Sequence, residues 1–134
     1  MVERRFPREV RALPAIVGFV ADFSVSHGLG DDPRHDVELI LEELFTNLVK
    51  YGGGATTDIA IALAREGDTL TIRMRDPNPT AFDITAPRPV VRGDDLGPLP
   101  GGRGLQMVRA MADELSYEHQ NGVGVITVTK RIPA

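Results

Sequence analysis

The segment over residues 33–50 constrains the fold most, because its apolar residues repeat at helical spacing and three consecutive glycines follow it. The apolar stripe consists of Val37, Leu41, Leu44, Phe45 and Leu48. At the other end, Asp32 suits the N-cap of a helix and Pro33 its first position. The pattern therefore predicts an amphipathic helix from about Pro33 to Lys50, ended by Gly52.

Three polar residues of this helix, Glu43, Asn47 and Lys50, fall together on the side opposite the apolar stripe. Polar helix faces are commonly just solvated, and these residues alone are compatible with that interpretation. A carboxylate and an amide one turn apart, beside a glycine-rich exit, also suit a hydrated magnesium ion and its phosphates. Both interpretations stay open at this point.

The other patterns place helices before pairs of strands. Helical spacing predicts a first helix from Arg8 to about His27, which Pro14 either starts or kinks and Gly28 ends. A weak pattern over residues 2–6 fits an edge strand, and another helix follows Gly104. The predicted hairpins pair residues 58–64 with 70–75, and 115–119 with 123–130 across an Asn-Gly turn.

This order of elements predicts an α+β fold: a two-layer sandwich with a mixed or antiparallel sheet and three helices packed on one face. A length of 134 residues fits one domain over the whole chain. The formal net charge of −4 and the lack of a basic stripe argue against nucleic-acid binding. The chain has no cysteine and no long apolar run, so we expect a cytoplasmic protein without a membrane partner.

Residues 76–104 differ from the rest, because they contain six prolines and five glycines. Such a long irregular segment is usually functional or disordered. At its start, Asp76 ends a predicted strand, where an aspartate is often only a turn residue. At its end, the run Gly101-Gly102-Arg103-Gly104 precedes a helix, where unpaired backbone amides favour anions, although a flexible hinge is equally compatible.

Three segments taken in order resemble the motifs of the GHKL ATP-binding superfamily, which has the Bergerat fold. Residues 43–47 look like its N-box, residues 75–79 with Phe82 and Asp83 like its first glycine box, and residues 101–114 like its second. The most similar branch is that of the bacterial anti-sigma-factor serine/threonine kinases. The resemblance covers the chain from the first helix to Lys130.

The resemblance implies ATP and Mg²⁺ as cofactors and gives each motif a role. Asn47 would bind the magnesium ion, Glu43 would be the general base, and Asp76 would accept a hydrogen bond from the adenine amino group. Residues 77–101 would form a lid over the nucleotide. The further nucleotide-binding residues would be Asn78, Gly101, Gly102, Arg103, Gly104 and Leu105.

The activity implied is the phosphorylation of a serine or threonine on an anti-anti-sigma antagonist protein, with sequestration of a sigma factor as a second role and a homodimer as the assembly. Asn78 stands where the family usually has glycine. This departure favours an alternative, a non-enzymatic partner-binding switch with weak or no nucleotide binding. A further alternative is the ATP-binding part of a histidine-kinase-like system, against which the lack of a histidine-bearing dimerisation helix argues.

Overall fold

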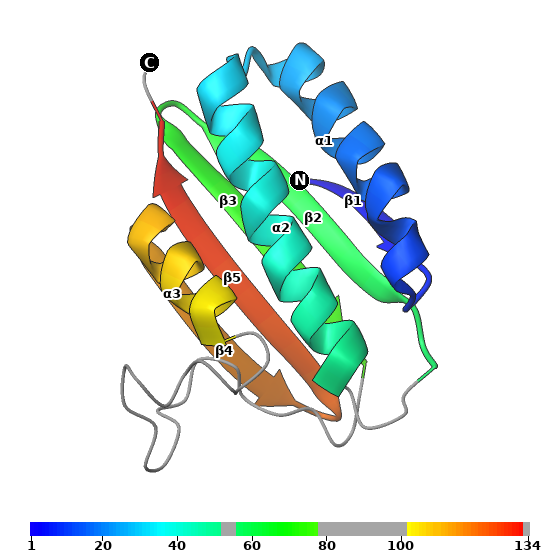
Figure 1. Cartoon of the computed structure of the whole chain (residues 1–134). Helices are drawn as coiled ribbons and strands as arrows, with labels where there is room; N and C mark the ends of the chain where they lie inside the picture. The colour runs from blue at the N-terminus through cyan, green and yellow to red at the C-terminus, as the bar shows by residue number, and fades with distance from the viewer. Residues whose placement is uncertain (52–55, 78–101, 133–134) are drawn as a thin grey trace.

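The computed structural model describes residues 1–51, 56–77 and 102–132 of the chain. Within these residues, five strands form an antiparallel sheet in the order β1-β2-β3-β5-β4, and three α-helices cover one face of it (Figure 1). The elements are β1 (Val2–Phe6), η1 (Val10–Ala12), α1 (Leu13–His27), α2 (Asp31–Tyr51), β2 (Ile59–Glu66), β3 (Thr69–Asp76), α3 (Gly102–Met111), β4 (Glu114–Gln120) and β5 (Val123–Arg131). The predicted α+β two-layer sandwich is confirmed, and the weakly predicted strand at the N-terminus exists as β1.

The first predicted helix begins later than expected, because residues 10–12 form the short 3₁₀ helix η1 and α1 starts only at Leu13. Pro14 lies in the first turn of α1, where its missing N–H group is not needed and its fixed φ angle suits the helix. Pro14 therefore starts the helix and does not kink it. Gly28 ends α1 in the left-handed conformation, with φ 69°.

The start of α2 differs from the prediction by two residues, because the helix begins at Asp31 and Asp32 is not its N-cap. The amide of Arg34 donates to the carbonyl of Gly30 at 3.1 Å, which closes the first turn. Pro33 still fits there, since the first N–H groups of a helix have no partner within it. The two aspartates lie in the first turn, where their negative charges interact favourably with the positive end of the helix dipole.

The core lies between the helices and one face of the sheet. Alternate residues of β3, namely Leu70, Ile72 and Met74, are buried against the helices together with Phe45 of α2. On the other side of the sheet, β2 places the small residues Ala60 and Ala62. The largest side chains therefore collect in one layer, as expected for a sheet covered on a single face.

Both predicted hairpins are confirmed by the register of the strands. In the second, Asn121 and Gly122 adopt φ angles of 54° and 77°. Positive φ at both central positions is typical of a tight type I′ turn, which explains why the Asn-Gly pair predicted it.

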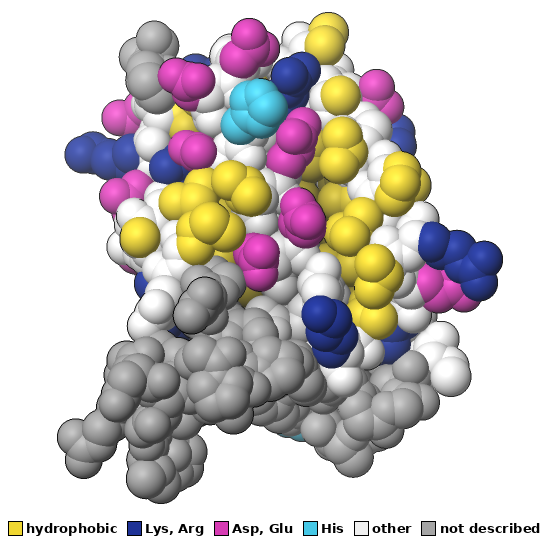
Figure 2. All heavy atoms as spheres, viewed as in Figure 1, with side chains coloured by type: hydrophobic (Ala, Val, Ile, Leu, Met, Phe, Trp, Pro, Cys, Tyr) yellow, Lys and Arg dark blue, Asp and Glu magenta, His cyan; other side chains and the backbone are white. Residues whose placement is uncertain are grey.

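The outer surface of the helical layer is mixed in character. Figure 2 shows acidic side chains between areas of hydrophobic side chains on this face. Val17 of α1 and Leu39 of α2 are 45% and 38% exposed. A hollow of about 220 Å³ lies between α1 and α2, lined in part by Val17 and Glu42.

The last turns of α2, the end of β3 and the start of α3 lie at the same end of the molecule (Figure 1). They carry the three sequence motifs that are far apart along the chain. The fold therefore brings these motifs together, which a helix–hairpin–helix order alone does not require. Of the connecting segment, residues 78–101 lie outside the described part, so the lid predicted there does too.

Candidate functional site

Asp76 is the last residue of β3, and its side chain belongs to the face of the sheet that packs against the helices. The alternation of β3 dictates this orientation, because Leu70, Ile72 and Met74 face the same way. Asp76 is only 2% exposed. A buried carboxylate is unfavourable unless it is paired and hydrogen-bonded, so its partners decide what it does.

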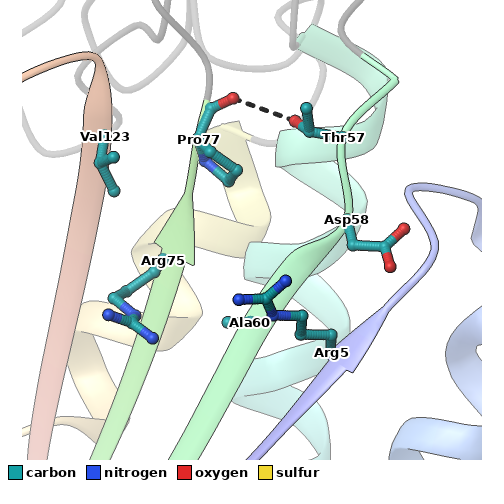
Figure 3. A pocket seen from close by; sticks show the side chains of 7 residues that line it. All are labelled: Arg5, Thr57, Asp58, Ala60, Arg75, Pro77 and Val123. Carbon is teal, nitrogen blue, oxygen red and sulfur yellow. Dashed lines mark hydrogen bonds between the residues drawn. The ribbon is translucent and has the colours of Figure 1, made fainter.

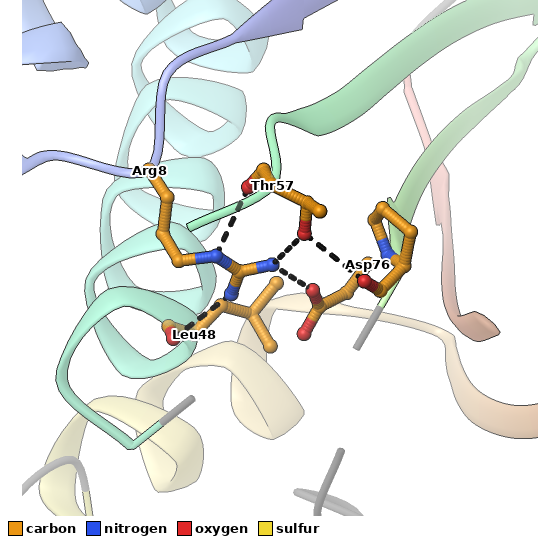
Figure 4. Close-up of polar contacts among 5 residues, drawn as sticks. Arg8, Leu48, Thr57 and Asp76 are labelled. Atoms are coloured by element: carbon orange, nitrogen blue, oxygen red, sulfur yellow. Dashed lines mark hydrogen bonds and ion pairs between the residues drawn. The ribbon is translucent and has the colours of Figure 1, made fainter. Parts of the chain in front are cut away.

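Arg8, which follows β1, is the charged partner of this carboxylate. Its Nη2 pairs with Oδ1 of Asp76, and both side chains are 3% exposed (Figure 4). The same guanidinium donates to the carbonyl of Thr57 at 3.1 Å and to its hydroxyl at 3.2 Å. It also donates to the carbonyl of Leu48 in α2 at 3.4 Å. The Thr57 hydroxyl in turn donates to the carbonyl of Pro77 at 3.0 Å.

This network joins four segments that are distant in sequence. They are the segment after β1 that carries Arg8, the last turns of α2, the residues before β2 and the end of β3. Charge-assisted hydrogen bonds are the stronger class in proteins, and the forked guanidinium fixes several acceptors at once. The carboxylate of Asp76 is thereby held in one orientation, and its charge is compensated.

The second oxygen of Asp76 has a different environment. Oδ2 is buried and has no hydrogen-bond partner among the residues that the structure describes. Nearly all buried polar atoms in proteins have such a partner, so an exception calls for an explanation. An N–H or O–H group of a ligand would complete the pairing.

Asn47 of α2 is the second buried polar side chain at this end. It is 2% exposed, and its Nδ2 has no hydrogen-bond partner within the described residues. A half-turn of the amide exchanges its nitrogen and oxygen, so the same group can offer an acceptor. Leu48, the next residue, carries the carbonyl that Arg8 contacts, so Asn47 lies close in the chain to the Asp76 network.

Glu43 lies one turn before Asn47 and is half-buried, whereas Lys50 is exposed. The three residues were expected on a face opposite the core, and this expectation is wrong for Asn47. The physical reason is that α2 packs between α1 and α3 as well as on the sheet, so little of its circumference reaches solvent (Figure 1). A simply solvated polar face is therefore excluded for Asn47.

Most of the glycine-rich run forms the start of α3. This helix begins at Gly102, two residues before the predicted Gly104, so Gly102, Arg103, Gly104 and Leu105 belong to its first turn. The first backbone amides of a helix lack partners within it and favour anions. The predicted residues Gly101 and Asn78 lie outside the described part of the chain.

A magnesium ion fits the donor set only if most of its ligands come from elsewhere. In the described ranges, no group of three or more histidine, cysteine, aspartate or glutamate side chains could hold a metal ion. Mg²⁺ usually binds one or two protein oxygens and completes its shell with phosphates and water. The buried amide of Asn47, with Glu43 one turn away, fits that mode of binding.

The sequence did not predict that Arg8 and Thr57 belong to the site. It also did not predict which residue of β5 lies beside Asp76. Gly124 pairs with Asp76 across the strands, and a Cβ atom at Gly124 would lie 3.0 Å from the hydroxyl oxygen of Tyr117. The tyrosine side chain therefore occupies the space that the glycine leaves. A glycine inside a strand pattern signals such close approach and could have revealed it, whereas nothing in the sequence singles out Arg8.

A separate cavity of about 440 Å³ lies on the other face of the sheet (Figure 3). Its lining includes Arg75 and Ala60, which by the alternation of the strands face away from Asp76. Arg75 donates to both carboxylate oxygens of Glu3 at 2.8 Å. Within the described ranges, Thr57 and Pro77 are the residues that belong both to this cavity and to the Arg8 network.

Comparison with known proteins agrees with the fold. The chain belongs to the histidine kinase-like ATPase domain family, whose profile matches residues 6–130. The name of this family implies ATP as its ligand. The match runs from Phe6, the last residue of β1, to Lys130 in β5, and it therefore includes every described segment of the candidate site.

A solved chain of similar fold comes from the SiaB–SiaC complex of Pseudomonas aeruginosa. The two share 13% sequence identity with a TM-score of 0.53, and the alignment covers 98% of this chain and 90% of that one. This similarity supports the fold. No curated protein matches the sequence significantly. No described helix combines the length and the apolarity that are needed to cross a membrane.

Proposed function

We propose that this protein binds Mg-ATP at the end of the sheet where α2, β3 and α3 meet. The observation that carries the proposal is the buried Oδ2 of Asp76, which has no partner among the described residues and is oriented by Arg8. The 6-amino group of adenine is a hydrogen-bond donor that would satisfy it. The ATPase family of the chain supports the same ligand.

The triphosphate would extend from there toward α2 and the start of α3. The amide oxygen of Asn47 would hold Mg²⁺, which supplies charge neutralisation at the phosphates. The backbone of the run from Gly101 to Leu105 would contact the phosphate oxygens, as helix N-termini do. Asn78 would lie near the adenine, in the segment that follows Asp76.

We further propose that the chain is a protein serine/threonine kinase. The hydroxyl oxygen of the acceptor forms a bond to the γ-phosphorus, and the bond from that phosphorus to the β,γ-bridging oxygen breaks, so ADP leaves. The carboxylate of Glu43 takes the proton of the attacking hydroxyl, which requires approach to within hydrogen-bonding distance. Half-burial of Glu43, one turn from Asn47, is compatible with this role.

The proposed acceptor is an anti-anti-sigma antagonist protein, and a sigma factor is the second proposed partner of a homodimeric regulator. The resemblance of three motifs to the anti-sigma-factor kinases supports these partners. The chain of similar fold from the SiaB–SiaC complex was solved with another protein, which fits a partner-binding role.

The test combines titration calorimetry with a phosphotransfer assay. Wild-type protein should bind ATP more tightly with Mg²⁺ than without it and should phosphorylate the antagonist on serine or threonine, as mass spectrometry would detect. Glu43→Gln should keep ATP binding but slow transfer by about 10²–10⁴-fold. Glu42→Gln, one residue away on an exposed part of α2, is the matched control and should leave both unchanged.

Failure of the wild-type protein to bind ATP would contradict the proposal. That result would support the alternative of a non-enzymatic partner-binding switch with weak or no nucleotide binding, which Asn78 favours because it stands where the family usually has glycine. ATP binding without transfer to any partner would contradict the kinase activity alone. Loss of ATP binding in Glu43→Gln would remove Glu43 from the role of general base.

A further inference from the structure

We propose that Arg8 is a positioning residue that makes the nucleotide site specific for adenine over guanine, because it donates to Oδ1 of Asp76 and leaves Oδ2 as the carboxylate oxygen without a donor among the described residues. This inference rests on the proposed function, since it concerns the same site. It gives a role to a residue outside the motifs that the sequence singles out.

The geometry fixes Arg8 in place. Besides Asp76, its guanidinium donates to the Thr57 carbonyl, the Thr57 hydroxyl and the Leu48 carbonyl, at distances from 3.1 to 3.4 Å (Figure 4). The side chain is 3% exposed, so water does not readily replace these contacts. A planar fork held by three other acceptors cannot swing away from the carboxylate without breaking them. Oδ1 of Asp76 therefore stays occupied.

Occupation of one oxygen matters because the two purines present different donors. On its Watson–Crick edge, adenine offers one donor, the 6-amino group, with the acceptor N1 beside it. Guanine offers two adjacent donors, its N1–H and its 2-amino group, which together match a carboxylate with both oxygens available. With Arg8 on Oδ1, the second guanine donor would have to share this buried oxygen with the guanidinium, whose positive charge repels it, so that donor would be poorly paired.

Guanine is also unfavourable when it is placed in the same orientation as adenine. If guanine occupied the position of adenine, its O6 acceptor would take the place of the 6-amino donor and would face Oδ2 of Asp76. Two acceptors without a proton between them repel, and a buried polar group without a partner lowers affinity considerably. Asp76 by itself therefore disfavours guanine in this placement, and Arg8 disfavours the placement in which guanine uses its two donors.

Removal of the guanidinium should reduce this discrimination. In Arg8→Met, both oxygens of Asp76 become available and the carboxylate loses its fixed orientation. We expect weaker binding of ATP and a smaller preference for ATP over GTP. The dissociation constant of GTP divided by that of ATP should fall about tenfold or more.

The experiment measures the dissociation constants of ATP and GTP, each with Mg²⁺, by titration calorimetry. The variants are Arg8→Met, Arg8→Lys and the control Arg65→Met. Arg65 also anchors backbone carbonyls, because it donates to those of His27, Gly28 and Gly67 at 2.8 to 3.1 Å, but it pairs with no carboxylate of the described residues. Circular dichroism verifies that each variant is folded.

The proposal requires that the wild-type protein prefers ATP, that Arg8→Met shrinks the preference, and that Arg65→Met preserves it. Arg8→Lys keeps a cation but cannot serve all four acceptors, so its ratio should lie between the two. If Arg8→Met does not fold, the ratio of Arg8→Lys decides.

An unchanged ratio in a folded Arg8 variant, or a wild-type protein that binds GTP as well as ATP, would overturn the role of Arg8 while leaving ATP binding intact. A wild-type protein that binds neither nucleotide would overturn the proposed function as well. The two failures are therefore distinguishable by the wild-type titration alone.

Discussion

Two arginines, Arg65 and Arg8, anchor the two ends of the sheet in similar ways but with different results. At one end, Arg65 donates to the carbonyls of His27, Gly28 and Gly67, where α1 ends and β2 turns into β3. At the other end, Arg8 donates to two carbonyls and a hydroxyl in the same manner, but it also pairs with the buried carboxylate of Asp76.

The difference lies in what remains unpaired. The acceptors around Arg65 are backbone carbonyls at turns near the surface, which such hydrogen bonds complete. The Arg8 end contains a buried acceptor, Oδ2 of Asp76, and a buried amide nitrogen, Nδ2 of Asn47, without partners among the described residues. The hydrogen bonds of Arg65 thus close turns of the backbone. Those of Arg8 hold buried polar groups in place at a position where a ligand could pair with them.

The largest effect on stability is expected from Asp76→Ala. This substitution leaves the buried guanidinium of Arg8 without its counter-charge, and breaking a buried ion pair from one side costs about 3–5 kcal/mol. The free energy of unfolding, measured by urea denaturation, should fall by that amount. A loss below about 1 kcal/mol would show that the pair is as well hydrated as surface pairs are.

A somewhat smaller effect is expected for the coupling between the two partners. The double variant Arg8→Met/Asp76→Ala removes both charges, so it should be more stable than the sum of the single losses predicts, by about 2–3 kcal/mol. A double-mutant cycle from urea denaturation measures this coupling. Additive losses would mean that Arg8 contributes mainly through its bonds to Thr57 and Leu48.

Arg65→Met should cost less, about 1–2 kcal/mol, because it removes hydrogen bonds to carbonyls that water can partly replace. The melting temperature should fall, while the affinity for ATP stays at the wild-type value. Weakened ATP binding in this variant would break the comparison, since it would couple the far end of the sheet to the site.

Asn47→Leu should change stability least. The two side chains have the same number of non-hydrogen atoms, branched at the same position, and the substitution removes a buried amide nitrogen that has no partner in the described part of the chain. The free energy of unfolding should stay within about 1 kcal/mol of the wild-type value or rise. The gain in ATP affinity on addition of Mg²⁺ should disappear, and its persistence would refute the assignment of Asn47 as the metal ligand.

Local patterns predicted most of the elements but not all their boundaries. The Asn121-Gly122 turn and the Gly28 helix end are confirmed, because each depends on a positive φ angle that few residues adopt. The start of α2 is two residues off, since Asp31 and Asp32 suit both the N-cap and the first turn. Asn47 was assigned to a polar face, yet it is buried, because helical spacing does not reveal how many neighbours a helix has.

The sequence by itself determined the helix and strand types, the tight turns and the three motifs, because these depend on residues close together in the chain. Only the tertiary structure decided that Arg8 would reach Asp76, 68 residues further on, and Leu48, 40 residues further on. A single arginine between a strand and a short helix carries no periodic signal, and its partners depend on the sheet order β1-β2-β3 and on the packing of α2. The unpaired oxygen of Asp76 follows from that packing, since only burial distinguishes it from a carboxylate in water.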